Sequence, residues 1–559
     1  MSYVVSSLAR PTPATDESKE RDVRDEQECE RLLIERVAAT GAHLVHAIAR
    51  PGSVAVRSYD ENGRGMGSPR IFGLVRAMRE ASSDGRRHLV VEIRRRADGY
   101  TVSRSTELES LSPVRLVLDP DYRYPGHPLP GMPRPAGIDV TDRPTDPVVL
   151  AETTALVEEF VALYTSIKGR APDFGRGRTE REIVAAETEL GFRLPEEVRA
   201  LYRVVECDPE EYGLLGAQRL LPLTAVVEWY HEGGPGVAVG EDGMFPTCAV
   251  VFEASPAGHV RRLSRSDWWV TITSDPGCNY GAIDLDPGPR GRRGQLFEFG
   301  RDFHGPVGYI AESVTVVLRQ VVEALRTGAY EDPDSEDPYL EFDDGLGRSA
   351  ETDHHRSVRM GGRGVDDVVA DLVDPSEVQA VYLNDGDVIG LGGLAPLPLL
   401  REISVNRANH VTTTLSHDQP VEALSIDART VDLEGLAGHP TLWSLKLTGV
   451  EEAVSVESLA AVPQLAELDL SGVEVRDVER LGEPMFSGLR VLTLSAEQWG
   501  RLREVNGVPT GLAAASMTGV NALDDAVAWA GGLRGRAGGG VGPRHGVGHD
   551  GDDVPGGPL

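Results

Sequence analysis

The sequence predicts a multidomain α+β protein: a small α+β domain first, an α+β sheet domain in the middle and a solenoid of short repeats at the C-terminus. Three observations predict this class. A chain of 559 residues is longer than one hydrophobic core normally serves. Stretches with helical spacing and stretches of alternating apolar residues are interspersed before residue 330. Beyond residue 378, one apolar pattern recurs at intervals of 21 to 24 residues.

The N-terminal part is predicted to hold a mobile segment, residues 1–20, and the small α+β domain, residues 21–118. Residues 26–40 and 69–81 carry apolar side chains at helical spacing. Residues 88–104 alternate in the manner of a hairpin with a turn at a glycine. This strand–Gly–Tyr–strand hairpin resembles that of YezG-like immunity domains.

A proline-rich stretch, residues 119–145, follows and is predicted to be an extended, semi-rigid linker. Asp146 and Pro147 are a suitable start for a helix, because Asp caps the first turn and Pro lacks the N–H that has no partner there. We therefore place the middle domain at residues 146–330.

Residues 179–206 predict two helices joined by a tight turn. Thr179 and Glu182 have the spacing of a capping box. Gly191 suits the left-handed conformation that ends many helices. Pro195 suits the first turn of the second helix.

This stretch resembles the opening signature of the SUKH superfamily, which includes the fungal Smi/Knr cell-wall assembly regulators. The downstream order agrees: a Leu-rich segment, a Trp pair with a strand, a strand ending in Asp, a hairpin and a closing helix. The resemblance covers roughly a third of the chain and implies an α+β sheet domain. The residues that carry the signature are Ile183, Glu187, Leu190, Gly191, Leu194, Pro195, Leu201 and Tyr202.

The C-terminal half begins with an acidic stretch, residues 331–364, predicted to be a solvated linker that proteases cut. Residues 365–530 resemble leucine-rich repeats, whose period is about 20 to 29 residues. We expect this region to be elongated and separable from the middle domain. Residues 531–559 are Gly-rich and predicted to be disordered. The repeats begin at Val378, Leu400, Val421, Leu442, Leu465 and Leu489.

The net charge and the cysteine pattern argue against several classes of binding partner and of stabilising site. The net charge of −32 and pI of about 4.9 argue against binding nucleic acid or an anionic membrane, and they favour a basic protein partner. The four cysteines are scattered, which argues against a disulfide framework or a zinc site. We find no signal peptide pattern and no apolar stretch of about 20 residues, so we expect a cytoplasmic protein.

We expect no catalytic residues, cofactor or metal. Five residues of the middle domain could be imagined as a metal-dependent nuclease cluster, but acidic residues beside turns usually cap them or face solvent. An enzyme with an undetected site is the third function class. The five residues are Asp275, Asp284, Asp286, Glu298 and His304.

Bacterial SUKH proteins typically bind and block a toxin domain without chemistry. The resemblance therefore implies an immunity protein that neutralises a basic toxin; the alternative is a regulatory or scaffold adaptor, as in the fungal relatives.

Aromatic side chains beside charged ones are common binding hot spots. The first-choice contact residues are Trp268, Trp269, Asp275 and Tyr280, although at least one tryptophan should fill the core, since neighbours on a strand face opposite ways.

Overall fold

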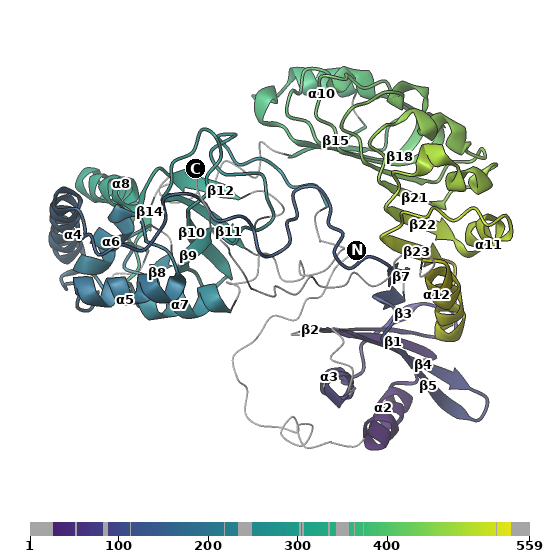
Figure 1. Cartoon of the computed structure of the whole chain (residues 1–559), viewed down its shortest axis with the longest axis horizontal. Coiled ribbons are helices and arrows are strands. Elements are labelled where there is room, and N and C mark those ends of the chain that lie inside the picture. The colour runs from purple at the N-terminus through teal and green to yellow at the C-terminus, as the bar shows by residue number, and fades with distance from the viewer. Residues whose placement is uncertain are drawn as a thin grey trace, which may run out of the picture. The chain divides into compact units, whose positions relative to one another are not determined.

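Figure 1 shows the computed structural model of the chain. The chain divides into two compact units. The first unit holds the described residues up to Pro120, Ala453–Glu457 and those from Ala466 onward; the second unit holds Asp121–Glu452 and Ser458–Leu465. The structure describes residues 26–50, 53–81, 88–111, 113–216, 218–232, 249–300, 303, 307–333, 336–342, 357–362, 364–372, 374–520 and 522–537. The predicted N-terminal segment, residues 1–20, lies outside these residues.

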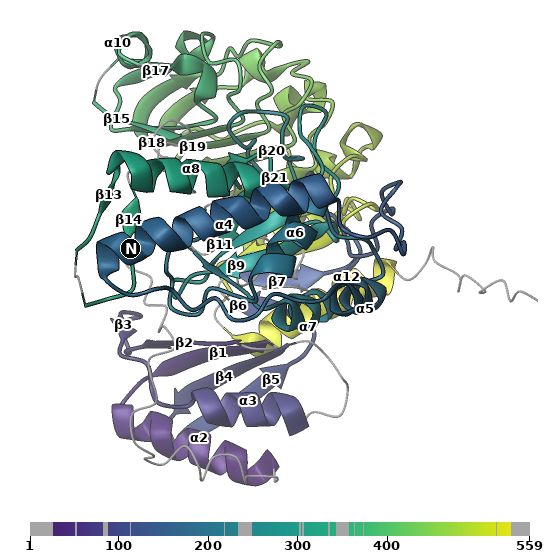
Figure 2. The ribbon, with the colours of Figure 1, turned by 90° about the vertical axis from the view of Figure 1, so that its left-hand side faces the viewer.

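The first unit contains an antiparallel sheet of order β3-β2-β1-β4-β5. Two helices cover one face of this sheet (Figure 2), and their apolar stripes make its core with Leu33, Leu74 and Ile93 fully buried. The two helices and the β4–β5 hairpin therefore lie where the sequence predicted them. Their bounds are α2 Glu26–Thr40, α3 Phe72–Ala81, β1 Leu44–Arg50, β2 Ser53–Tyr59, β3 Gly65–Met66, β4 Leu89–Arg96 and β5 Gly99–Ser105.

A short hairpin within the predicted N-terminal domain belongs to a different sheet. Its strands are β6 (Ser110–Leu111) and β7 (Val114–Val117), and β7 pairs antiparallel with β23 (Ala514–Thr518) of the C-terminal region. Arg490 adds an ion pair to Asp119 at 2.9 Å. The predicted domain boundary at residue 118 therefore separates β7 from β23, two strands that the structure joins by hydrogen bonds.

The Gly-rich tail predicted from residue 531 is helical at its start, so that prediction is wrong for residues 531–537. Helix α12 runs over Leu523–Ala537 and contacts β5. Trp529 and Leu533 are buried and anchor the helix despite its two glycines, and the Leu523 amide donates to Glu92 at 3.2 Å. Residues 538–559 lie outside the described part of the chain.

The middle domain of the second unit is an antiparallel sheet of order β12-β11-β10-β9-β8 with helices packed against it (Figure 1). Its large core joins the helices to β9, β10 and β11. The bounds are α4 Pro147–Lys168, α5 Glu180–Leu190, α6 Glu196–Val204, α7 Leu223–His231, α8 Val314–Thr327, β8 Arg219–Leu220, β9 Trp269–Ser274, β10 Asn279–Asp284, β11 Gln295–Gly300 and β12 Gly308–Ala311.

The proline-rich stretch is extended, as predicted, but it packs along the middle domain instead of spacing two domains apart. The Asp267 carboxylate accepts the backbone N–H groups of Gly131 and Met132 at 2.6 and 2.7 Å. The Trp268 indole donates to the Pro133 carbonyl at 2.8 Å, and Ile138 is buried in the core. A Pro-rich chain keeps its carbonyls free of local hydrogen bonds, so side chains of the domain can use them.

The described part of the acidic stretch is also packed, so the prediction of a solvated linker is wrong there. Leu340 is fully buried in the middle-domain core. Strand β13 (Tyr330–Glu331) pairs with β14 (Glu341–Phe342), and the Tyr164 hydroxyl donates to the Pro338 carbonyl at 2.5 Å. Leu340, the strand pairing and the Tyr164 bond together hold this segment against the domain. Residues 343–356 lie outside the described part.

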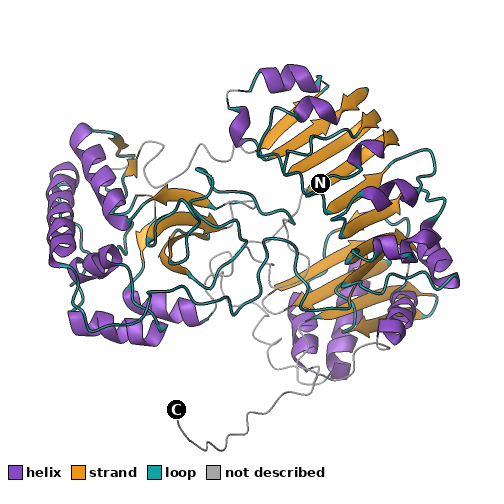
Figure 3. Ribbon diagram, turned by 45° about the horizontal axis from the view of Figure 1, so that its top comes forward, coloured by secondary structure: helices purple, strands orange, loops and turns teal. Residues whose placement is uncertain are grey.

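The C-terminal region contains neighbouring parallel strands (Figure 3). Strands β16, β18, β19, β20, β21 and β22 each begin two residues after a predicted repeat start. In the second unit the order is β15-β16-β18-β19-β20, with β17 beside β18; in the first unit β21, β22 and β23 follow one another. All six predicted repeat starts are buried. The strands are β15 Ser357–Gly361, β16 Ala380–Asn384, β17 Val388–Gly390, β18 Glu402–Thr412, β19 Ala423–Asp432, β20 Ser444–Thr448, β21 Glu467–Gly472 and β22 Val491–Ser495.

Short helical segments connect these strands. Strands β18 and β19 are 11 and 10 residues long, which exceeds the short strand expected for each repeat, and the pairing between them contains a register shift.

Among the described residues, no helix has both the length and the apolarity needed to cross a bilayer. The connecting helices are α10 Val365–Ala370, η1 Pro375–Glu377, η2 Leu391–Leu394, η3 Glu434–Leu436, η4 Val456–Ala461, η5 Val478–Gly482, η6 Pro484–Phe486 and α11 Ala496–Glu504.

The core assignment of the middle domain predicts a large effect for Leu201→Asp. Leu201 is fully buried, so the substitution places an unpaired charge in an apolar core and should destabilise the domain by at least about 3 kcal/mol. The measurement is hydrogen exchange of the α5 and α6 amides in the full chain. Val148→Asp is the control, because Val148 is 74% exposed on α4. Equal exchange in the two variants would contradict the assignment.

Candidate protein-binding site

The two helices of the signature stretch begin and end where the sequence predicts. Thr179 and Glu182 form a complete capping box, in which the Thr179 N–H donates to the Glu182 carboxylate at 2.6 Å. Gly191 has φ +80° and ends α5, its N–H donating to the Glu187 carbonyl at 2.8 Å. Pro195 lies one position before the first residue of α6. The tight turn between the helices is therefore built from local rules.

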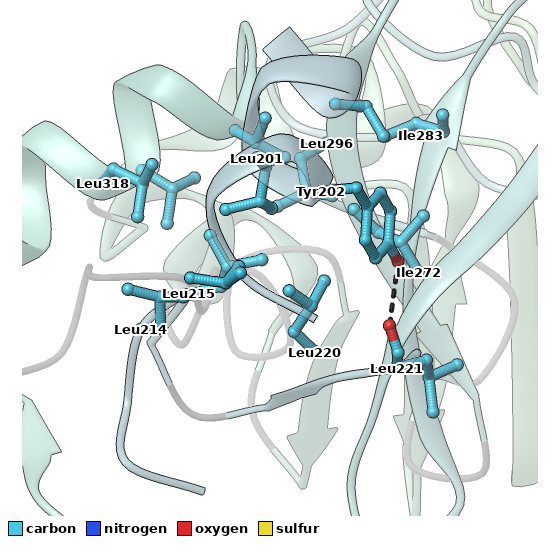
Figure 4. Packing of buried hydrophobic residues seen from close by; sticks show 14 of the residues in the cluster. Leu201, Tyr202, Leu214, Leu215, Leu220, Leu221, Ile272, Ile283, Leu296 and Leu318 are labelled. Carbon is cyan, nitrogen blue, oxygen red and sulfur yellow. Dashed lines mark hydrogen bonds between the residues drawn. The ribbon is translucent and has the colours of Figure 1, made fainter. Parts of the chain in front are cut away.

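The apolar signature residues form the centre of the middle-domain core. Leu201 and Tyr202 pack among apolar residues of the sheet and of the 214–221 segment (Figure 4), and the Tyr202 hydroxyl donates to the Leu221 carbonyl at 2.9 Å. This bond fixes the second signature helix against the residue that directly follows β8. The other buried apolar signature residues are Ile183, Leu190 and Leu194.

Glu187 is the polar signature residue, and it is fully buried beside Arg199, which is equally buried. One Glu187 oxygen accepts the Leu194 N–H at 2.8 Å, and the other pairs with the Arg199 guanidinium. Arg199 also contacts Glu180 and donates to the Thr145 hydroxyl at 3.2 Å. Burial raises the pKa of Glu187 to about 7 and lowers that of Arg199 to about 10.

Arg199 was missed by the sequence analysis, although a signal exists. It lies three residues before Tyr202 and one after Val198, within the buried stripe of α6. An arginine at a buried helical position requires a carboxylate partner, and Glu187 is an acidic residue on the buried stripe of the preceding helix. The pair holds the helical hairpin and the start of α4 together.

The two candidate tryptophans are not exposed, so the expectation that they anchor a partner is wrong. Trp268 and Trp269 are each 8% exposed. They point to opposite faces of the sheet, as alternation predicts. Trp268 joins the large core, while Trp269 packs on Phe297, with ring centroids 4.9 Å apart, in a smaller cluster on the other face.

The turn between β9 and β10 retains exposed and half-exposed groups. The Asp275 carboxylate accepts the backbone N–H of Asn279 at 2.8 Å and its side-chain amide at 2.9 Å, so Asp275 shapes the turn. Cys278 is exposed at φ +68°. Tyr280 is half-buried, and burial raises its pKa.

Trp229, near the end of α7, joins this turn. Its ring meets that of Tyr280 edge to face at a centroid distance of 5.9 Å, and it is half-buried. Sequence reasoning missed Trp229 because the contact links α7 to a turn about fifty residues later in the chain. We call Trp229, Asp275, Cys278 and Tyr280 the turn edge. It combines two partly exposed aromatic rings with one carboxylate.

The remaining acidic candidates serve the fold. Asp284 is fully buried and accepts the Asp286 N–H and the Gln295 side-chain amide, both at 3.0 Å. Burial raises its pKa to about 7. Glu298 is 4% exposed, and His304 lies outside the described residues. Within the described part of the chain, no three His, Cys, Asp or Glu side chains are grouped to hold a metal ion.

Comparison with known proteins agrees with this domain. Residues 177–320 match the profile of the SMI1 / KNR4 family (SUKH-1). These residues form an SMI1/KNR4 domain. It extends from Gly177, three residues before α5, to Gln320 near the middle of α8, and thus contains most of the core, the Glu187–Arg199 pair and the turn edge.

Two fungal relatives each match a part of this chain. A KNR4/SMI1 homolog of Yarrowia lipolytica is 28% identical over 114 residues, which are 20% of this chain and 16% of the relative. A glucan synthesis regulatory protein of Neurospora crassa is 32% identical over 78 residues, which are 14% of each chain. The chain therefore matches only a small part of each of these relatives.

A solved internalin from Listeria monocytogenes shows a weak structural likeness. The comparison covers 24% of this chain and 40% of the internalin at 20% identity, with a TM-score of 0.19. A TM-score this low does not establish a shared fold.

The burial of Asp284 predicts that the stability of the SMI1/KNR4 domain falls as pH rises. Its folded pKa of about 7 lies above its ordinary value, so its stabilising contribution is complete below about pH 4 and is lost as pH rises through 7. The slope should approach about 1.4 kcal/mol per pH unit. Asp284→Asn keeps a neutral side chain, so its stability relative to the parent should grow between pH 5 and 8. A constant difference across this range, measured by urea unfolding, would contradict the prediction.

Proposed function

We propose that this protein acts by binding another protein, without turnover, through its SMI1/KNR4 domain. The observation that carries the proposal is the turn edge: two half-exposed aromatic rings and a carboxylate at one border of a rigid sheet. Aromatic rings of this kind supply contact area at low entropic cost and often dominate binding energy. The buried acidic groups of the same sheet are occupied by backbone and amide donors, which suits a structural role.

The preferred version is a cytoplasmic immunity protein that neutralises a toxin domain. The chain carries a net charge of −32, and such a field would steer a basic partner towards it. Many toxins that act on nucleic acid would be basic for the same reason that nucleic-acid-binding proteins are. The C-terminal strands, which we propose to be leucine-rich repeats, would add a second protein-binding surface. This proposal requires no cofactor, nucleic acid or membrane.

The second version is a regulatory adaptor, and one specific observation favours it. The Neurospora crassa relative is described as a glucan synthesis regulatory protein. In this version the SMI1/KNR4 domain would bring signalling partners together instead of blocking a toxin. Both versions share the binding step and differ only in the partner.

The test begins with capture of partners from the source cell by the full chain, followed by expression of each partner with and without the chain. Rescue from a toxic partner at one-to-one stoichiometry would support immunity. Housekeeping partners without toxicity would support the adaptor. Multiple turnover of a substrate by the purified chain would contradict both versions.

The turn edge predicts that Tyr280→Ala weakens binding of the captured partner at least tenfold. Removal of the ring takes away one of the two half-exposed rings of the turn edge. Tyr309→Ala is the control, because Tyr280 and Tyr309 are both partly buried against the same small cluster but lie on different strands. Equal losses in the two variants, measured by calorimetry, would place the binding site elsewhere.

A further inference from the structure

Four side chains occupy equivalent positions in successive repeats of the second unit. Each directly precedes a parallel strand: Gln379 before β16, Arg401 before β18, Glu422 before β19 and Trp443 before β20. Backbone bonds connect each to the next; for example, the Arg401 N–H donates to the Gln379 carbonyl at 2.8 Å. We call these four residues the docking row. Their exposed fractions lie between 1% and 8%, although they stand at the border of a sheet.

The first position of the docking row binds the backbone of the SMI1/KNR4 domain. The Gln379 side chain accepts the Glu253 N–H at 2.7 Å and donates to the Glu253 carbonyl at 3.1 Å. An amide side chain with both groups satisfied by one residue imitates a strand pairing. Glu253 belongs to residues 249–262, an irregular segment that precedes β9.

The next two positions form an alternating chain of charges with the same segment. Arg401 contacts the Glu253 carboxylate at 3.3 Å and the Glu422 carboxylate at 2.7 Å. Arg262 reaches the same Glu422 carboxylate at 2.7 Å. Both carboxylates in this set, the buried Glu422 and the half-buried Glu253, thus have a cation beside them, and each arginine has an anion. Groups of this kind are stable when buried only if all are paired.

The last position is covered by the proline-rich stretch. The Trp443 ring lies 5.3 Å from that of Tyr124, and its indole donates to Glu422 at 3.3 Å. The proline-rich stretch is itself joined to the 249–262 segment, since the His127 ring contacts the Ala249 carbonyl at 3.0 Å. The 249–262 segment and the proline-rich stretch therefore form one continuous surface that meets all four residues; we call this surface the SMI1/KNR4 side.

We propose that the docking row is a protein-binding surface and that its occupant is this chain's own SMI1/KNR4 side. The SMI1/KNR4 domain and the first repeats would then be held together and would bind an external partner as a single rigid unit. The row has the composition of a protein interface: an aromatic ring at one end, paired charges in the centre and a backbone clasp at the other end. These contacts contradict the prediction that the repeat region is separable from the middle domain, at least for the repeats of the second unit. It does not depend on the identity of the partner.

The test is amide hydrogen exchange of the full chain, in which one variant changes a residue of the docking row and another changes a residue of the 249–262 segment that contacts it. Gln379→Ala removes the backbone clasp, and Glu253→Ala removes the carboxylate that Arg401 contacts. Both variants should speed exchange of residues 249–262 at least tenfold, while the α6 amides keep the parent's rates. Retained α6 protection shows that the SMI1/KNR4 domain is still folded.

The control is Arg407→Met, which removes an exposed ion pair to Asp385 from the same sheet. Arg407 is 66% exposed, so its loss should leave the exchange of residues 249–262 unchanged. Small-angle scattering should show expansion for Glu253→Ala and none for the control. Gln379→Ala is the deciding variant, because the Glu253 carboxylate also accepts the Gly258 N–H inside the segment, at 3.2 Å. The proposal is overturned if exchange in this segment is the same for Gln379→Ala and the control.

Discussion

The Glu187–Arg199 ion pair is the constraint on which the SMI1/KNR4 domain depends. Burying two opposite charges is costly, and the attraction between them compensates only when the remaining donors and acceptors are satisfied as well. That condition is met, because Glu187 also accepts the Leu194 N–H and Arg199 also contacts Glu180 and Thr145. The pair therefore fixes the turn between α5 and α6 and the segment that leads into α4 in one arrangement.

The position of the turn edge follows from this frame. With α6 fixed, the Tyr202 hydroxyl reaches the Leu221 carbonyl and sets the chain that pairs beside β9. Strands β9 and β10 then carry Asp275 and Tyr280 at their connecting turn. A binding surface held by buried interactions loses little freedom when a partner docks, and a preorganised surface binds more tightly. The packing of the core therefore determines where the turn edge lies.

Much of this architecture could be predicted because it rests on local rules. The capping box at Thr179, the C-cap at Gly191 and the repeat spacing all follow from residues close together in the sequence. The errors share one physical origin, which is long-range contact. Trp268 is buried by the proline-rich stretch, and Leu340 is drawn into a core whose helices begin almost two hundred residues earlier. No local pattern identifies such partners.

The most direct measurement is a double-mutant cycle on Glu187 and Arg199, read from exchange of the Leu194 amide in the full chain. Each single variant, Glu187→Gln or Arg199→Met, breaks this buried pair and should lower the protection of this amide by about 3 kcal/mol or more. The double variant should cost far less than the sum of the two. Additive losses would contradict the claim that this pair, acting as a unit, holds the domain together.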